Sequence, residues 1–240
     1  MLEKLLFNVT IYEIFGFRRS DTIPISILGE QSTMQIEVAF PVLGELIPTD
    51  HAYMLYSALT RSVRTFHDET AHVRFSPING DRGEKGTIRI ISCSRLRVRL
   101  PPEQIAVILP LAGRTLKLGE HSVTLRPPTV IPIVPVSMLV AKIVTFKNSK
   151  MPERFLAVAR QKLDEMDVAG EPGIPLIQQG KRAGEPRRQI LRVKGRHIVG
   201  YPLQIAGLTV EESLRLQEEG LGGRRRIGCG FFMPYRPRMQ

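Results

Sequence analysis

The chain has 240 residues, enough for one large domain or two small ones, and a formal net charge of +11. Its 42% apolar and 24% charged residues are typical of a globular protein, and its two cysteines provide neither a disulfide framework nor the spacing of zinc ligands. No segment has the pattern of a signal peptide or a bilayer span, so we expect a cytoplasmic protein without a membrane partner.

The positive charge is concentrated at the C-terminal end of the chain. Residues 181–240 contain 13 Lys and Arg against 5 Glu, whereas the other 180 residues contain 21 Lys and Arg against 18 acidic residues. A basic end on a nearly neutral chain is typical of nucleic-acid binding. The alternative is a protein that is simply basic, because charge alone does not identify a partner.

The first half of the chain is predicted to alternate strands with short helices. Residues 1–34 form an extension in which Leu5–Phe17 resembles a strand. From Gln35 onward we predict a strand at 36–42, a helix with apolar positions from Ala52 to Phe66 that Thr49 or Asp50 caps, strands at 73–78 and 87–91 joined in a hairpin by 79–83, a strand at 95–100, a helix at 104–111, and extended segments at 116–125 and 129–136. In the strand 95–100, arginines alternate with apolar residues, so we expect a half-buried strand with an exposed arginine face.

The second half repeats the same order of elements. We predict a strand at 139–146, a helix from Pro152 to Leu163, strands at 189–193 and 197–205 around a basic turn, a helix at 213–219 and a last strand at 231–232. Thr209 and Glu212 form a capping box before the last helix.

The predicted elements of each half therefore follow the order βαββαβ. The fold class is α+β, with tandem ferredoxin-like (RRM-like) domains at residues 35–136 and 137–240, and the second domain ends in a glycine-rich loop. Residues 1–34 stay outside both domains as an N-terminal extension.

The glycine-rich loop, residues 220–230, combines five glycines with Arg224, Arg225 and Arg226. Glycines allow positive φ and a close approach of backbone to a ligand, and arginine provides forked donors that match phosphate. The loop follows a predicted helix and precedes a strand, which is the wrong order for a P-loop or a dinucleotide fingerprint, and Arg225 stands where the third glycine of that fingerprint belongs. The pattern favours a polyanionic ligand.

Three stretches together resemble a known family: residues 50–59 (DHAYMLYSAL), residues 66–69 (FHDE) and the loop 220–232. The glycine loop resembles the CRISPR-associated RAMP superfamily, and the histidine stretches resemble its endoribonucleases that cut CRISPR repeat transcripts, the sixth Cas family. The resemblance covers about residues 35–234.

This resemblance implies an activity without metal or cofactor. The RNA's own 2′-hydroxyl would attack the phosphate, leaving a 2′,3′-cyclic phosphate and a 5′-hydroxyl. The implied partners are the CRISPR repeat hairpin and its crRNA product, to which the protein stays bound, together with other subunits of a CRISPR effector complex.

His67 is the first candidate for proton transfer, because it occupies the family's histidine position and imidazole titrates near neutral pH. On a continuous helix Thr60 and Tyr56 lie on the same stripe as His67. Where some relatives have a tyrosine, this chain has Thr60 beside Arg61. Tyr56 or His51 is the alternative for the second catalytic role.

Each catalytic candidate also has a structural interpretation. The helix dipole favours histidine at a helix C-terminus, His51 could orient local backbone, and tyrosines such as Tyr56 often lie at the boundary of a core. His72 and Arg74 follow closely enough to be candidates for phosphate stabilisation.

The RNA-binding surface is expected on the second domain and to read shape and phosphates. Its predicted residues are Gly222, Gly223, Arg224, Arg225, Arg226, Lys194, Arg196, Arg187, Arg188 and Arg192. Two alternatives remain: a non-catalytic RAMP subunit that binds crRNA, and a general RNA-binding protein, although strand 95–100 lacks the aromatic residues of an RNA-recognition motif.

Overall fold

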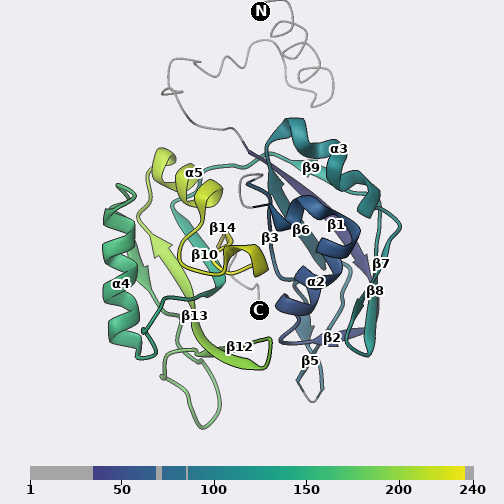
Figure 1. Cartoon of the computed structure of the whole chain (residues 1–240). Helices are drawn as coiled ribbons and strands as arrows, with labels where there is room; N and C mark the ends of the chain where they lie inside the picture. Colours follow the sequence, from purple (N-terminus) through teal and green to yellow (C-terminus); the bar gives the residue numbers. More distant parts are fainter. Residues whose placement is uncertain (1–34, 69–71, 85, 236–240) are drawn as a thin grey trace, which may run out of the picture. The chain divides into compact units, whose positions relative to one another are not determined.

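The computed structural model describes residues 35–68, 72–84 and 86–235, so the predicted extension at 1–34 lies outside the described residues. The first half contains a sheet, a small hairpin sheet and short helices (Figure 1). Its elements are β1 (Ile36–Leu43), β2 (Leu46–Pro48), α2 (Ala52–Ser62), η2 (Arg64–His67), β3 (Arg74–Phe75), β4 (Asp81–Arg82), β5 (Thr87–Arg89), β6 (Arg95–Leu100), η3 (Pro102–Gln104), α3 (Ile105–Ile108), η4 (Leu109–Leu111), β7 (Thr115–Leu118), β8 (His121–Leu125) and β9 (Thr129–Ile131).

The second half contains one sheet and two α-helices. Its elements are β10 (Met138–Val144), α4 (Pro152–Asp164), β11 (Glu171–Gly173), β12 (Gln189–Val193), β13 (Arg196–Ala206), α5 (Val210–Glu219), η5 (Arg225–Ile227) and β14 (Phe232–Pro234). The mixed α/β composition is therefore confirmed. Among the described residues, no helix is long and apolar enough to cross a membrane.

The two main sheets have comparable strand orders. The first runs β3-β6-β1-β8-β7 with β9 also paired to β1, and the second runs β11-β13-β10-β14 with β12 paired to β13. All of these pairs are antiparallel. In both sheets the first strand along the chain, β1 or β10, lies in the interior of the sheet.

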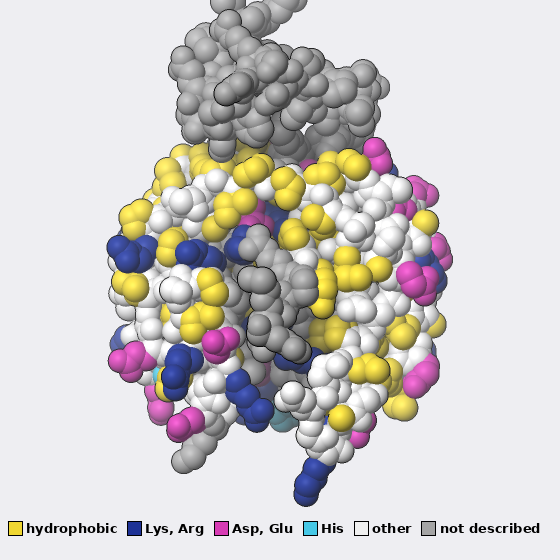
Figure 2. All heavy atoms as spheres, turned by 180° about the vertical axis from the view of Figure 1, so that it is seen from behind, with side chains coloured by type: hydrophobic (Ala, Val, Ile, Leu, Met, Phe, Trp, Pro, Cys, Tyr) yellow, Lys and Arg dark blue, Asp and Glu magenta, His cyan; other side chains and the backbone are white. Residues whose placement is uncertain are grey.

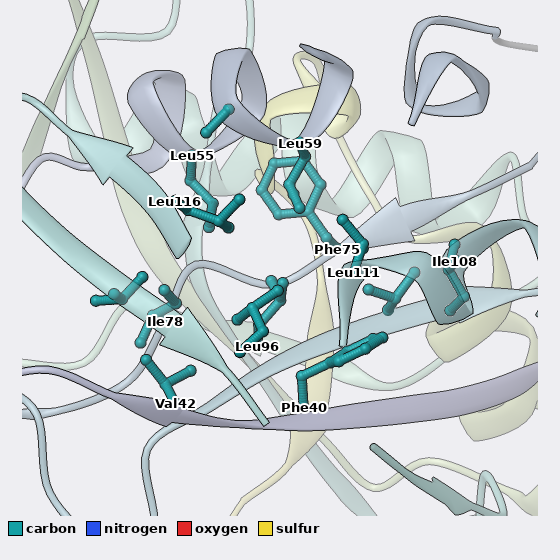
Figure 3. Packing of buried hydrophobic residues seen from close by; sticks show 14 of the residues in the cluster. Phe40, Val42, Leu55, Leu59, Phe75, Ile78, Leu96, Ile108, Leu111 and Leu116 are labelled. Carbon is teal, nitrogen blue, oxygen red and sulfur yellow. The ribbon is translucent and has the colours of Figure 1, made fainter. Parts of the chain in front are cut away.

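One face of the first sheet packs against α2 and the short helical turns that follow β6. Leu55 and Leu59, four residues apart on α2, are fully buried against Phe40, Leu96 and their neighbours (Figure 3). The four-residue spacing places both leucines on one helix face, and their burial removes apolar surface from water. In the second half the apolar face of α4 packs in the same way onto its own sheet.

Helix α2 is shorter than its apolar pattern predicts. The helix ends at Ser62 because Val63 is extended (φ −141°, ψ 109°), and a separate 3₁₀ turn continues to His67. The N-cap is His51, without a side-chain cap bond, so neither Thr49 nor Asp50 caps the helix as predicted. The Asp50 carboxylate instead accepts from the Arg192 amide of β12, at 2.7 Å.

The predicted hairpin between residues 73–78 and 87–91 is wrong. Strand β3 pairs with β6, whereas β5 pairs with β2 and with β4, the segment predicted to be the turn. The Asn-Gly sequence at 79–80 predicts a tight turn between two paired strands. In the structure the chain passes at this point from β3 of the first main sheet to β4 of the small three-stranded sheet. By contrast, the predicted capping box at Thr209 and the basic hairpin β12–β13 are confirmed.

The arginine face of β6 departs from the prediction at one residue, Arg99. Arg99 is 1% exposed and lies opposite Glu37 of β1, on the face of the sheet away from α2. The second half of the chain covers this face: Arg99 donates to Gln217 of α5, and its guanidinium stacks 4.2 Å from the centre of the Phe231 ring. The strand pattern identified the two faces correctly, and Arg95 and Arg97 stay half-exposed, but it did not show that the second half covers the arginine face at Arg99.

Candidate functional site

Two predicted catalytic residues, Tyr56 and His67, meet in the structure. The Tyr56 hydroxyl lies 3.1 Å from Nδ1 of His67, and the two rings meet edge to face with centroids 5.6 Å apart. His67 is exposed and Tyr56 is half-buried. Among the described residues no group bonds Nε2 of His67, so this nitrogen is available to a ligand.

The Tyr56 side chain lines a pocket of about 670 Å³ between the two halves. Arg74 of β3 and His72 line the same pocket from the first half. The opposite wall is the glycine loop, Gly222–Ile227, together with Val193 at the end of β12. The pocket therefore combines the phenol of Tyr56 and the carboxylate of Asp68 at one wall with three consecutive arginines at the other. His67 does not line the pocket itself and adjoins it through its contact with the Tyr56 hydroxyl.

The glycine loop, residues 220–230, has a conformation that depends on glycine at several positions. Gly222 has φ +85°, and a Cβ there would lie 2.8 Å from Val144 Cγ1 and 2.9 Å from the Thr145 oxygen. At Gly230 a Cβ would lie 2.1 Å from the Leu221 oxygen. These glycines let the loop pack against itself and against the end of β10, where the Gly223 amide donates to the Thr145 oxygen at 2.8 Å.

Arginines fix the end of α5, from which the glycine loop emerges. Its last three carbonyl oxygens each accept from one: Gln217 from Arg99 at 2.7 Å, Glu218 from Arg74 at 2.6 Å and Glu219 from Arg225 at 2.9 Å. These carbonyls lack helical partners, and cations are favoured at this end of the helix dipole. Since Arg99 and Arg74 belong to the first half, they fix the loop relative to His67. Burial, followed by the nearby Arg225, lowers the pKa of Arg74 to about 10.

The remaining predicted basic residues are exposed and lie just before β12, within it and in the turn after it. Lys194 and Gly195 form the tip of the β12–β13 hairpin with positive φ, and Arg192 and Arg196 flank them. Arg187 and Arg188, before β12, line a different pocket of about 770 Å³. Lys and Arg side chains do not merge into one patch on the rear face, where hydrophobic side chains cover much of the surface (Figure 2).

A family model described as "Cas6 Crispr" matches residues 36–237, nearly all of the part that the structure describes. The chain belongs to the Cas6 family. It is 36% identical over 226 residues to the "CRISPR-associated endonuclease Cas6" of Myxococcus xanthus (strain DK1622), covering 91% of this chain and 92% of that protein.

Solved structures share the fold of this Cas6 family member at low sequence identity. One, "CRISPR associated protein Cas6", has a TM-score of 0.55 at 16% identity and covers 85% of this chain and 99% of that one. A structure titled "Characterization of a Cas6-related gene from Pyrococcus furiosus" has the same TM-score and identity, covering 83% and 98%. "An RAMP protein binding different RNA substrates" has a TM-score of 0.54 at 18% identity, covering 83% and 98%.

The other catalytic candidates of this Cas6 family member do not take part in the hydrogen bond between the Tyr56 and His67 side chains. The Thr60 hydroxyl donates to the Tyr56 and Ser57 oxygens of its own helix, and Thr60 does not line the pocket. The break at Val63 has removed it from the stripe of His67. Arg61 is exposed and is likewise absent from the pocket walls.

His51 is buried, with 1% of its surface exposed. Its Nδ1 lies 2.8 Å from the Pro48 oxygen, and its Nε2 accepts from the Ile78 amide at 3.0 Å. Burial, and then the nearby Lys142, lowers the pKa of His51 to about 4. This histidine joins two loops of the first half and has no ring nitrogen left for a substrate.

Sequence reasoning did not single out two cations of the structure, the buried Arg99 and the half-buried Lys142. Arg99 stood out only as one of three alternating arginines, and Lys142 only as a charge inside an apolar run. The position of each charged residue within an apolar strand was the one feature of the sequence that could have indicated its burial. Among the described residues, no three His, Cys, Asp or Glu side chains gather as a metal site, and burial raises the pKa of the Cys229 thiol to about 12.

Proposed function

We propose that this protein is a metal-independent endoribonuclease that cuts CRISPR repeat RNA at one phosphodiester bond. One observation carries the proposal: the exposed His67, paired with Tyr56, adjoins a pocket whose other wall presents Arg224, Arg225 and Arg226. The relative with 36% identity is named as an endonuclease, which supports the same activity.

In the proposed reaction the RNA supplies its own nucleophile. Nε2 of His67 takes the proton from the 2′-hydroxyl, whose oxygen attacks the adjacent phosphorus and closes a 2′,3′-cyclic phosphate. The bond to the 5′-oxygen breaks, and the Tyr56 hydroxyl gives that oxygen its proton. The tautomer that fits these roles has Nδ1–H donating to the Tyr56 oxygen, which leaves Nε2 as an acceptor and the phenol proton for the leaving group.

Positive charge at the pocket stabilises the phosphorane transition state. Arg74 is held at the pocket wall by its bond to the Glu218 oxygen, and Arg225 is held by the Glu219 oxygen. Because both guanidiniums are positioned before the RNA binds, little reorganisation is needed as charge develops on the phosphate oxygens.

The RNA-binding surface extends from this pocket along the second half. Gly222, Gly223 and Arg224–Arg226 form the pocket wall, and the β12–β13 hairpin presents Arg192, Lys194 and Arg196. A two-stranded ribbon with a cationic tip suits the phosphates of a folded stem, which is read mainly by its shape. Product retention, membership of an effector complex and a cytoplasmic location stay predictions.

We also infer that each half is a ferredoxin-like domain, with boundaries at 35–136 and 137–240. The strand orders β3-β6-β1 followed by β8 or β9, and β11-β13-β10-β14, support this interpretation. The first strand of the motif (β1 or β10) lies between the third strand (β6 or β13) and the fourth. The second strand (β3 or β11) lies on the outer side of the third.

The test is cleavage of the repeat transcript in the presence of a chelator. We expect one product pair ending in a cyclic phosphate and a 5′-hydroxyl. His67→Ala should slow cleavage by about 10²–10⁴-fold and leave RNA binding intact. His121→Ala on β8 is the matched control and should cut normally. Full activity in His67→Ala, or cleavage that the chelator abolishes, would disprove the mechanism; tight binding without any scission would favour a non-catalytic RAMP subunit.

A further inference from the structure

Thr145, which directly follows β10, is a fully buried threonine beside the glycine loop. Its hydroxyl donates to the Gly223 oxygen at 3.1 Å, and its main-chain oxygen accepts from the Gly223 amide at 2.8 Å. One residue therefore bonds both polar groups of the Gly223 main chain. A valine would fill the same space without a polar atom to satisfy, so packing alone does not explain the hydroxyl.

These two bonds fix the part of the glycine loop that precedes η5. The ends of the loop are held separately: the Leu221 amide donates to the Gly230 oxygen at 3.4 Å, and the Gly230 amide donates to the Ile143 oxygen at 2.8 Å. Within the part of the chain that the structure describes, residues 222–224 form no hydrogen bond outside the loop except those with Thr145. Without the hydroxyl, this stretch has one attachment left.

The end of β10 holds Thr145 in a fixed position. The register between β10 and β13 shifts between Ala141 and Val144, so the strand has a β-bulge just before Thr145. Opposite it stands Gly200, where a Cβ would lie 2.6 Å from the Val144 oxygen and 3.0 Å from Thr145 Cγ2. The threonine is therefore packed closely against the main chain of β13, which limits how far it can shift.

Arg224, the residue after Gly223, has a left-handed main chain with φ 58° and ψ 31°. A Cβ makes this conformation costly, and non-glycine residues keep it only where their surroundings enforce it. The peptide between Gly223 and Arg224 is planar, so fixing its carbonyl also fixes the orientation of the Arg224 amide. The Thr145 hydroxyl thus acts on an exposed arginine that lines the pocket of about 670 Å³, as Tyr56 does.

The Cys229 thiol indicates that Thr145 and the Arg224 charge lie close together. Burial raises the pKa of this thiol to about 12, and the charge of Arg224 and then the Thr145 hydroxyl act in the opposite direction. Since both groups act on one buried thiol, both are its neighbours.

We propose that Thr145 is a positioning residue, whose hydroxyl holds Arg224 in the conformation that contacts the RNA phosphate. This inference rests on the proposed function, since it names the support of one phosphate-binding arginine in that same site. A guanidinium that is held in place before the RNA arrives loses less conformational freedom on binding. Thr145 itself touches no RNA and acts only through Arg224.

The test is a double-mutant cycle on the affinity for a repeat RNA that carries 2′-deoxyribose at the attacking nucleotide, so that it is bound but not cut. Thr145→Val should weaken binding about five- to thirtyfold, which corresponds to the cost of returning a non-glycine residue to the left-handed region. In the Arg224→Gln background the same substitution should change the affinity less than about twofold, because the charge through which Thr145 acts is already lost. A purely structural threonine would weaken binding equally in both backgrounds.

Three controls separate the hydroxyl from the fold. Thr145→Ser keeps the hydroxyl and should bind as the wild type does, whereas Thr145→Cys, with a weak donor, should lie between the serine and valine variants. In the background of Arg196→Gln, on the β12–β13 hairpin, Thr145→Val should have its full effect. Thr124→Val on β8, which removes a hydroxyl bonded to Thr115 at 2.9 Å, should bind normally.

Thermal unfolding of each variant gives the temperature range in which it is folded, and affinities are compared within that range. Thr145→Val should unfold at a lower temperature than the wild type, because the Gly223 oxygen loses its donor. If Thr145→Val does not fold, the cycle is run with Thr145→Cys.

Equal effects of Thr145→Val in the wild-type and Arg224→Gln backgrounds would overturn the inference, and so would a serine variant that binds as weakly as the valine variant. If Arg224→Gln weakens binding and Thr145→Val does not, only the positioning role fails. If the wild type does not bind the repeat RNA, or its affinity does not depend on Arg224, the phosphate contact of the proposed function fails as well.

Discussion

Arg99 of β6 and Gln217 of α5 are joined by a buried hydrogen bond across the two halves, from Nη1 to the main-chain oxygen at 2.7 Å. Arg99 also donates to the Glu37 carboxylate at 3.0 Å and stacks on Phe231, which follows the glycine loop. One side chain from the first sheet thus contacts the helix before the loop and the residue that directly follows the loop. The position of the loop relative to His67 is therefore a property of the interface.

Replacing Arg99 should destabilise the protein strongly. Arg99→Met leaves the Glu37 carboxylate buried with Arg97 alone and removes the partner of the Gln217 oxygen, a change that typically costs about 3–5 kcal/mol. The double variant Arg99→Met with Glu37→Gln should recover part of this loss in urea unfolding. Lys162→Met, which removes a solvent-exposed partner on α4, is the control and should leave the midpoint unchanged. Equal stability of Arg99→Met and the wild type would contradict this role.

Tyr56→Phe should slow cleavage while the protein and its RNA affinity stay intact. The substitution keeps the ring and removes only the hydroxyl at 3.1 Å from His67. If Tyr56 protonates the leaving oxygen, a substrate with sulfur at that 5′ position should be cut by Tyr56→Phe nearly as fast as by the wild type, because a thiolate leaves without a proton. His67→Ala should stay slow on both substrates. A defect of Tyr56→Phe that persists with the sulfur substrate would exclude the acid role.

Gly222→Ala should disrupt the loop more than a glycine substitution at a similar backbone angle elsewhere. Gly222 (φ +85°) and Gly113 (φ +79°) both have positive φ, so alanine costs about 1 kcal/mol at either site. Only at Gly222 does the new Cβ approach Val144 and Thr145 below 3 Å, whereas nothing lies within 4 Å at Gly113. We expect Gly222→Ala to unfold at lower urea and to cut slowly. Equal effects of the two variants would refute the packing argument.

The buried His51 should make stability fall in mild acid. Its pKa is about 4 in the folded protein and near 6.5 when unfolded, so the unfolded state binds the proton first. The stabilisation is complete above pH 6.5 and is lost as the pH falls from 6.5 toward 4, by roughly 2 kcal/mol at pH 5. The difference in unfolding free energy between wild type and His51→Gln, measured at pH 7 and pH 5, isolates this effect. A difference that does not change with pH would show that His51 titrates normally.

RNA affinity should depend steeply on salt, and the dependence should diminish with each phosphate-binding arginine removed. For each of Arg224→Gln and Arg196→Gln, the slope of log affinity against log salt concentration should fall by about 0.7–0.9. Arg114→Gln, at the turn before β7, should leave the slope unchanged. Unchanged slopes for the first two variants would place the RNA elsewhere.

Several features of the site could be predicted from the sequence because they depend on local residues. The first helical segment predicts both His67 and Tyr56 as site residues. The two side chains meet even though the helix ends before His67, at the extended residue Val63. The same periodicity predicts Thr60 beside His67, but the Thr60 hydroxyl bonds its own helix instead. The reason is that the extended Val63 separates α2 from the turn of His67, so helical spacing no longer relates the side chains on its two sides. Periodicity indicates which residues share a face only while the helix continues.

The sequence by itself determined the main strands and helices, the basic C-terminal end, the capping box of α5 and the family, because these follow from nearest neighbours, periodicity and motif. It did not determine the short strands β2, β4 and β11 or the pairing of β3 and β5. Only the tertiary structure decided that the arginine face of β6 is covered at Arg99, that His51 is buried and that Lys142 lies in a pocket beside Arg187. Each of these depends on which surface of one half meets the other. Burial of a charged side chain is set by contacts between residues far apart in the sequence, 118 positions in the case of Arg99 and Gln217, and no local pattern specifies such a contact.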